Sequence, residues 1–182
     1  MGKVRRVFAE KKPDFAVAAK SLKHEIRHFL GVEGVTDVRE LIRYDVENVS
    51  DGIFERAKIT VFSEPPVDDI YEETFDAKGG RVFSVEYLPG QFDQRADSAE
   101  QCIRLLGADE EPVIRTAVTY IISGDISDSE FEAVKKHCIN PVDSRESGDE
   151  KPETLIQEFE EPEDVLIFEG FTGRDEPALR EL

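Results

Sequence analysis

The chain has 182 residues, of which 39% are hydrophobic and 35% charged, and 23 basic residues against 41 acidic ones give a formal net charge of −18. A chain this acidic is repelled by phosphate backbones and by anionic lipid surfaces, so nucleic acid and membranes are poor candidates for partners. Its length suits one ordinary domain, or two small ones that share a core.

Cysteine content and the amino terminus both favour the cytoplasm. The two cysteines, Cys102 and Cys138, fit a reducing compartment better than a disulfide scaffold. Each lies among apolar helix positions, so we interpret both as buried structural thiols. The basic segment Met1–Phe15 lacks the apolar core of a secretory signal, and no run of residues has the length and hydropathy of a transmembrane helix.

The first half of the chain predicts the order strand-helix-strand-helix-strand. A strand covers Lys3–Glu10, and an amphipathic helix begins near Asp14 and ends at Gly31, where a left-handed C-cap is expected. Residues 36–46 alternate apolar and polar side chains, which is typical of a half-buried strand. Ser50 or Asp51 then caps a short helix, and a closing strand follows Pro65-Pro66. The apolar stripe of the first helix comprises Phe15, Ala18, Leu22, Ile26, Phe29 and Leu30.

The second half predicts the same order of elements. Ser127 and Glu130 have the spacing of a capping box at the start of its second helix. The sixth strand is expected in "ETLIQEFEE", residues 153–161. The other predicted elements are a strand at Val82–Tyr87, a helix from about Asp97 to Leu106, a strand at Val113–Ile122 and a helix at Asp128–Cys138.

Five sequence blocks of the first half recur in the second, in the same order and at a nearly constant offset, which carries Phe29 onto Leu105 and Val38 onto Ile114. The blocks are "RRVFAE" and "GRVFSVE", "FLG" and "LLG", "VRELIRY" and "IRTAVTY", "SDGIFERAK" and "SDSEFEAVK", and "PVD" in both. We infer a tandem duplication with halves at 1–77 and 78–160. The fold expected is α+β, with two strand-helix-strand-helix-strand halves packed as a pseudo-twofold, dimer-like unit with antiparallel sheets. The sequence leaves open how the two sheets meet.

Residues 161–182 lie beyond the repeat. "DVLIFEG" predicts one more strand, and "TGRDEPALREL" looks like the capped start of a helix. We expect this segment to be the start of a linker to a further part of a longer protein.

A short motif on the first helix raises the possibility of a metallopeptidase. His24, Glu25 and His28 form His-Glu-x-x-His, in which two histidines four residues apart can bind zinc and the glutamate can act as general base. On the helical wheel both histidines face solvent, and the second half has Glu100, Gln101 and Arg104 at the corresponding positions. We therefore interpret the match as accidental, and the zinc peptidase stays a minor alternative.

The longest motif, "EYLPGQFDQRADSAEQC" at Glu86–Cys102, resembles a known family, together with "VTDVRELIRY", "EPPVDDIYEE", "VIRTAVTY" and "INPVDSRE". The family is the amino-terminal, duplicated small-structural-subunit-like domain of single-chain phosphoribosylformylglycinamidine synthase, the formylglycinamide ribonucleotide amidotransferase of purine biosynthesis. The resemblance implies a parent ligase that uses ATP, Mg and glutamine. It implies no catalytic residue and no cofactor in this chain, whose partners would be the synthetase and glutaminase domains.

Two segments are candidate sites. The resemblance places the loop Pro89–Ser98 against the synthetase core, near the substrate cleft. Its polar groups before a helix amino terminus could hold an anion, although Asp97 or Ser98 could equally be ordinary helix caps. The loop residues are Gln91, Phe92, Asp93, Gln94, Arg95, Asp97 and Ser98.

The second candidate segment is the turn "INPVDSRE", with Asn140, Asp143 and Arg145. It is either a plain helix-stop turn or an interface turn anchored by Arg145. A function of a different class also stays open. Paired α+β halves often bind small molecules where they meet, so the chain could be a stand-alone sensing or interaction module.

Overall fold

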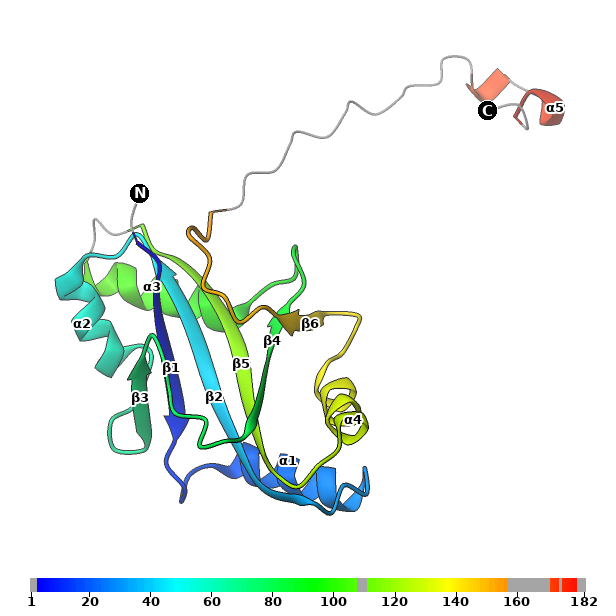
Figure 1. Cartoon of the computed structure of the whole chain (residues 1–182). Helices are drawn as coiled ribbons and strands as arrows, with labels where there is room; N and C mark the ends of the chain where they lie inside the picture. The colour runs from blue at the N-terminus through cyan, green and yellow to red at the C-terminus, as the bar shows by residue number, and fades with distance from the viewer. Residues whose placement is uncertain (1–2, 108–110, 157–170, 174, 180–182) are drawn as a thin grey trace.

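The structure is a computed structural model that describes residues 3–107, 111–156, 171–173 and 175–179. One antiparallel sheet of six strands forms its centre, and four helices pack on one face of the sheet (Figure 1). The α+β class and the antiparallel pairing are as predicted. In chain order the elements are β1 (Arg5–Lys11), α1 (Val17–His28), β2 (Val35–Glu47), α2 (Asp51–Thr60), β3 (Asp68–Glu72), β4 (Arg81–Tyr87), α3 (Gln94–Leu106), β5 (Val113–Gly124), α4 (Asp128–Cys138), β6 (Ser144–Ser147), a 3-10 turn (Phe171–Gly173) and α5 (Glu176–Leu179).

The two halves join edge to edge rather than face to face. The strand order is β3-β1-β2-β5-β4-β6, so β2 and β5 pair at the centre. Ile42 lies opposite Val118, which is its own counterpart in the repeat. The same offset carries the pair Phe8↔Tyr71 of β1 and β3 onto Ser84↔Ser147 of β4 and β6. A pseudo-twofold axis therefore passes through the Ile42–Val118 pair.

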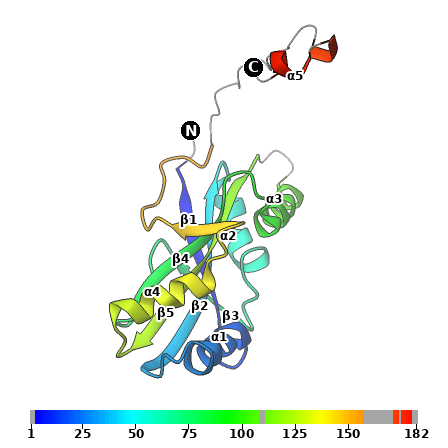
Figure 2. The ribbon, with the colours of Figure 1, turned by 90° about the vertical axis from the view of Figure 1, so that its right-hand side faces the viewer.

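Both hydrophobic clusters on the helix-bearing face draw side chains from both halves. One cluster joins Phe54 of α2 to Ala99 and Ile103 of α3, and the other joins Ile26 of α1 to Val134 of α4. Figure 2 shows α1, α2 and α3 on the same side of the twisted sheet. Since each cluster loses many of its members if one half unfolds, we expect the two halves to unfold as one cooperative unit.

The opposite face of the sheet carries no helix among the described residues. The segment 73–80 crosses it in front of β1 and β2 (Figure 1), where the Phe75 ring meets Phe8 at 4.8 Å between centroids. After β6 the chain returns across the same face. There the Leu155 amide donates to the Glu47 carboxylate at 2.7 Å, and Glu47 is only 1% exposed. This helix-free face, which carries both charged and apolar side chains, is thus partly covered by two non-helical segments.

The predicted position of the sixth strand was wrong. β6 is Ser144–Ser147 and pairs with β4, whereas residues 153–156 lie outside the sheet, where Thr154 and Leu155 bind the Glu47 carboxylate. The repeat explains the true position, because the offset that relates Ile42 to Val118 moves β3 onto 144–148. Residues 157–161 of the predicted strand, and the strand predicted in "DVLIFEG", lie outside the described residues.

The start of the first helix and part of its stripe also differ from the prediction. α1 begins at Val17 because the Phe15 amide donates to the Lys12 carbonyl at 2.8 Å, which makes a turn before the helix. Ala19 replaces Ala18 as the buried alanine, while Phe15 and Phe29 are exposed beyond the two helix ends. The remaining stripe residues are buried or partly buried, and Gly31 has the expected positive φ of 72°.

At the carboxyl end, α5 (Glu176–Leu179) lies within the segment for which a helix start was predicted. Over the part of the chain that the structure describes, none of the helices combines the length and the hydropathy needed to cross a bilayer.

Candidate functional site

The two candidate segments lie side by side, although they are far apart in the sequence. Tyr87 pairs with Ser144 at the end of the β4–β6 ladder. Immediately after it, the Leu88 amide donates to the Asp143 carbonyl at 2.8 Å. The loop that follows β4 and the turn that precedes β6 therefore form one continuous edge of the molecule.

The loop is anchored by Asp93, which is the N-cap of α3. One carboxylate oxygen accepts from the Ala96 amide at 2.9 Å, and the other accepts from the amide and hydroxyl of Thr116 at 3.1 and 2.8 Å. The prediction that Asp97 or Ser98 caps this helix was wrong, because the bonds to Thr116 fix Asp93 at the cap and α3 begins at Gln94. Asp97 lies in the first turn, where it accepts from Gln101 at 2.7 Å.

The turn is held by its own side chains. Asn140 donates from Nδ2 to Asp143 Oδ2 at 3.0 Å and accepts from the Val142 amide at 3.2 Å. Arg145, on β6, makes a forked pair with Glu86, with Nε at 2.9 Å and Nη2 at 2.8 Å from Oε1. Turn formation therefore accounts for Asn140 and Asp143, and the Arg145 guanidinium is half exposed but already paired within the chain.

Large apolar side chains stand exposed on both segments. Phe92 is 70% exposed at the tip of the loop, and Val142 is 78% exposed in the turn. Neither packs in the three hydrophobic clusters that the described residues form. Exposed apolar side chains ringed by polar groups are typical of surfaces that bind another protein.

A cavity of about 650 Å³ opens on the helix-bearing face beside these segments. Its floor is the middle of the sheet near the pseudo-twofold axis, where Val118 lies between Tyr44 and Tyr120. Its rim comes from the predicted loop and turn, which contribute Gln94, Arg95, Ser98, Asn140 and Asp143.

Burial shapes the electrostatics around this cavity. It raises the pKa of the Glu40 carboxyl above its ordinary value, and the nearby Arg95 guanidinium opposes that rise. Burial also raises the pKa of the Cys138 thiol to about 12, which makes it a poor nucleophile at neutral pH. Cys102 lines the same cavity but is exposed, so the prediction of two buried thiols holds only in part for Cys138 and was wrong for Cys102. The reason is that Cys102 lies about 100° around α3 from the buried Ile103.

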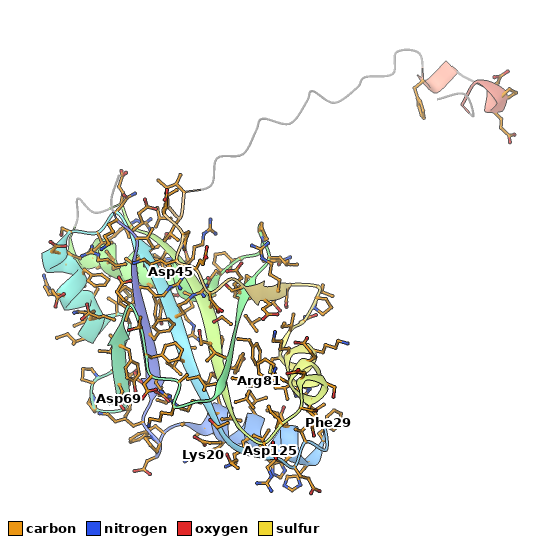
Figure 3. The ribbon with its side chains drawn as sticks, in the orientation of Figure 1. Lys20, Phe29, Asp45, Asp69, Arg81 and Asp125 are labelled. Carbon is orange, nitrogen blue, oxygen red and sulfur yellow. The ribbon has the colours of Figure 1, made fainter. Side chains whose placement is uncertain are left out.

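A second cavity, of about 270 Å³, lies on the helix-free face between the loop after β4 and the segment after β6. Its floor is charged. Arg6 forms a forked pair with Asp45 at 2.6 and 2.9 Å, and beside them Arg43 is only 5% exposed. Asp45 lies high on the sheet in Figure 3. Burial lowers the pKa of the Arg43 guanidinium, while the carboxylate of Asp45 opposes this.

The His-Glu-x-x-His motif lies on an exposed face of α1. The rings of His24 and His28 contact each other with centroids 4.3 Å apart and planes tilted by 45°. Glu25 pairs with His137 of α4 at 3.1 Å, and this hydrogen bond, with one from Ser21, lowers the pKa of the Glu25 carboxyl. Over the described residues, no group of three or more His, Cys, Asp or Glu side chains is placed to hold a metal ion.

Comparison with known proteins adds no assignment: no protein-family model and no curated protein matches the chain.

Sequence reasoning named the rims of both cavities but missed their floors. Tyr44 stood on the apolar side of an alternating strand, which predicts a core position. No pattern in the sequence indicated that the four helices leave the centre of the sheet uncovered, or that Arg6, Arg43 and Asp45 meet on the other face.

Proposed function

We propose that this chain is a non-catalytic assembly domain of an ATP- and glutamine-dependent amidotransferase that converts formylglycinamide ribonucleotide to formylglycinamidine ribonucleotide. In this role it holds the synthetase and glutaminase parts together, so that ammonia passes between them without escaping to water. ATP and Mg bind to the synthetase part, and the chain supplies contacts rather than chemistry.

The observation that carries the proposal is the meeting of the two candidate segments at one edge. The resemblance to the amidotransferase family depends most on the long motif that contains the loop after β4, and the turn before β6 belongs to one of its shorter motifs. These segments are joined by the bond from Leu88 to Asp143, and each presents a large exposed apolar side chain, Phe92 or Val142. A pair of apolar anchors with a polar rim is what a docking surface requires.

Further support comes from the rigidity of this edge. Asp93 ties the loop to β5 through Thr116, and Asn140 closes the turn through Asp143. A surface that is ordered before binding loses less conformational entropy when the partner docks. The loop and the turn are therefore suited to position a partner rather than to move during a reaction.

The test is complementation in trans. The chain is mixed with a synthetase–glutaminase remainder that lacks its amino-terminal region, and the glutamine- and ATP-dependent formation of the amidine product is followed. We expect turnover to be restored, and the concentration of chain needed for half-maximal rescue to rise roughly tenfold or more in Phe92→Ser.

The matched control is Phe15→Ser. Phe15 is 51% exposed and lies after the end of β1, at the opposite end of the sheet from the loop after β4 and the turn before β6 (Figure 1), so this variant should rescue as the unchanged chain does. Equal loss in both variants, or no binding and no rescue with a folded remainder, would contradict the proposal.

A second candidate function is a small-molecule binding module, which the cavity of about 650 Å³ favours. That volume lies in the range of ligand pockets, and two tyrosines with Arg95 would suit an aromatic anion. The probe is 8-anilinonaphthalene-1-sulfonate, whose fluorescence should rise to saturation at one site. Cys102→Phe narrows the cavity and should abolish the signal, whereas Leu105→Phe, on the same helix and 87% exposed, should leave it unchanged. Unsaturable fluorescence, or an equal effect of both variants, would exclude this candidate.

A further inference from the structure

The two halves of the repeat differ in how they hold one arginine. On the helix-free face of the first half, Arg39 forms a forked pair with Glu10, with both N–O distances 2.7 Å. Tyr71 donates to the same carboxylate at 3.0 Å. The Arg39 side chain is only 14% exposed, so this arrangement is closed.

The repeat carries Glu10, Arg39 and Tyr71 onto Glu86, Arg115 and Ser147. The carboxylate and the hydroxyl keep their contact, since Ser147 donates to Glu86 at 2.7 Å. The ion pair between the arginine and this carboxylate is not kept in the second half. Glu86 is instead paired with Arg145, which stands opposite it in the β4–β6 register, where the first half has Asp69 opposite Glu10.

Arg115 has therefore lost the carboxylate that its counterpart holds. Asp45 lies opposite Arg115 in the β2–β5 ladder, but both of its carboxylate oxygens accept hydrogen bonds from Arg6. Among the described residues, the Arg115 guanidinium makes no hydrogen bond or ion pair. It lines the cavity of about 270 Å³, together with Arg43, Arg145 and Gln91.

Most acids of this cavity already have ion-pair or hydrogen-bond partners within the chain. Asp45 accepts from Arg6, Glu86 from Arg145 and Ser147, and Asp93 from Ala96 and Thr116. Glu150, at the exposed edge, is the remaining acid of the lining. Arg115 is exposed, and its guanidinium, whose donors have no partner among the described residues, lines this cavity together with the buried Arg43.

We propose that this cavity is a binding site for a small oxyanion, the phosphate or carboxylate group of a metabolite, held by the Arg115 guanidinium. The planar fork of arginine suits two oxygens of such a group, and Arg145 and the Gln91 amide lie on the walls to complete the shell. The inference does not rest on the assembly role, because the chain alone forms the whole cavity.

The experiment is a titration of the ¹⁵N-labelled chain with inorganic phosphate, and separately with acetate, at constant ionic strength. We expect saturable shifts at the Arg115 Nε–H and at the Gln91 amide, with the paired Arg39 Nε–H unmoved as an internal control. Saturation by phosphate alone identifies a phosphate site, and saturation by both probes identifies a general oxyanion site. Saturation by acetate alone identifies a carboxylate site.

Three variants sharpen the result. Arg115→Gln should weaken binding about tenfold or more, and Arg115→Lys, which keeps the charge but not the fork, should weaken it less. Glu150→Gln should strengthen binding, because it removes the negative charge of an exposed acidic side chain at the edge of the cavity. The proposal is overturned if neither probe gives saturation, if Arg39 shifts in parallel with Arg115, or if Arg115→Gln binds as tightly as the unchanged chain.

Discussion

The two halves of this protein share the same order of strands and helices, yet they carry different side chains on the helix-free face of the sheet. In the first half, Arg6, Arg43 and Asp45 form a buried charged cluster. The second half has Val82, Thr119 and Ile121 at the corresponding positions of the repeat, where Val82 and Ile121 join an apolar cluster with Phe8 and Leu41.

The difference shows which positions the fold constrains. The helix-bearing face must fill the two hydrophobic clusters, so its apolar pattern is kept in both halves. The opposite face is covered only by segments 73–80 and 148–156 among the described residues, so it tolerates charged, polar or apolar groups provided that each buried charge is paired. Divergence between the copies, including the release of Arg115, is concentrated on this less constrained face.

The largest expected effect comes from breaking the charged cluster in the first half. Asp45→Asn leaves the Arg6 and Arg43 guanidiniums buried without their carboxylate, which should lower the free energy of unfolding by about 3–5 kcal/mol. Urea denaturation followed by circular dichroism measures the loss. The triple variant Arg6→Val, Arg43→Thr and Asp45→Ile carries the residues of the second half at these positions. It should recover most of the free energy of unfolding that Asp45→Asn loses. A loss below about 1 kcal/mol in Asp45→Asn would show that the cluster is not a buried, coupled unit.

The next effect tests whether the halves share one core. Ile26 of α1 and Ile103 of α3 are both fully buried, one in each hydrophobic cluster. Truncation of either to alanine should cost about 2–4 kcal/mol. In each variant, unfolding should remain a single transition with coincident signals from circular dichroism and tyrosine fluorescence. A biphasic transition in one variant would mean that the halves unfold separately.

The smallest effect concerns the capping box of α4. The Ser127 hydroxyl and amide both donate to Glu130, and these bonds lower the pKa of the Glu130 carboxyl below its ordinary 4.5. A lowered carboxyl pKa stabilises the folded state above that ordinary value, and this stabilisation disappears as pH falls through the folded-state pKa. Ser127→Ala should therefore lower the thermal midpoint at pH 7. The difference in thermal midpoint between the variant and the unchanged chain should be smaller at pH 3. A difference that is the same at both pH values would contradict the assignment.

Local patterns decided most of the secondary structure. The limits of α4 and its capping box followed from Ser127 and Glu130, and the alternation in β2 gave the correct face for Tyr44 and Arg43. The sixth strand was misplaced because "ETLIQEFEE" has an apolar core, whereas the short strand Ser144–Ser147 has none. Ser144–Ser147 forms a strand because it pairs with the edge of β4, and not because of its hydropathy.

The sequence by itself determined the internal repeat and the α+β class, because repeats and periodicity can be read along the chain, while the two segments of the candidate edge were named from the family resemblance. Only the tertiary structure decided that the halves join through β2 and β5, that Arg6 pairs with Asp45, and that Glu86 pairs with Arg145 rather than with Arg115. These contacts join residues that lie far apart in the chain. Which partner a charge finds over such separations depends on strand register and competition, and no local pattern encodes it.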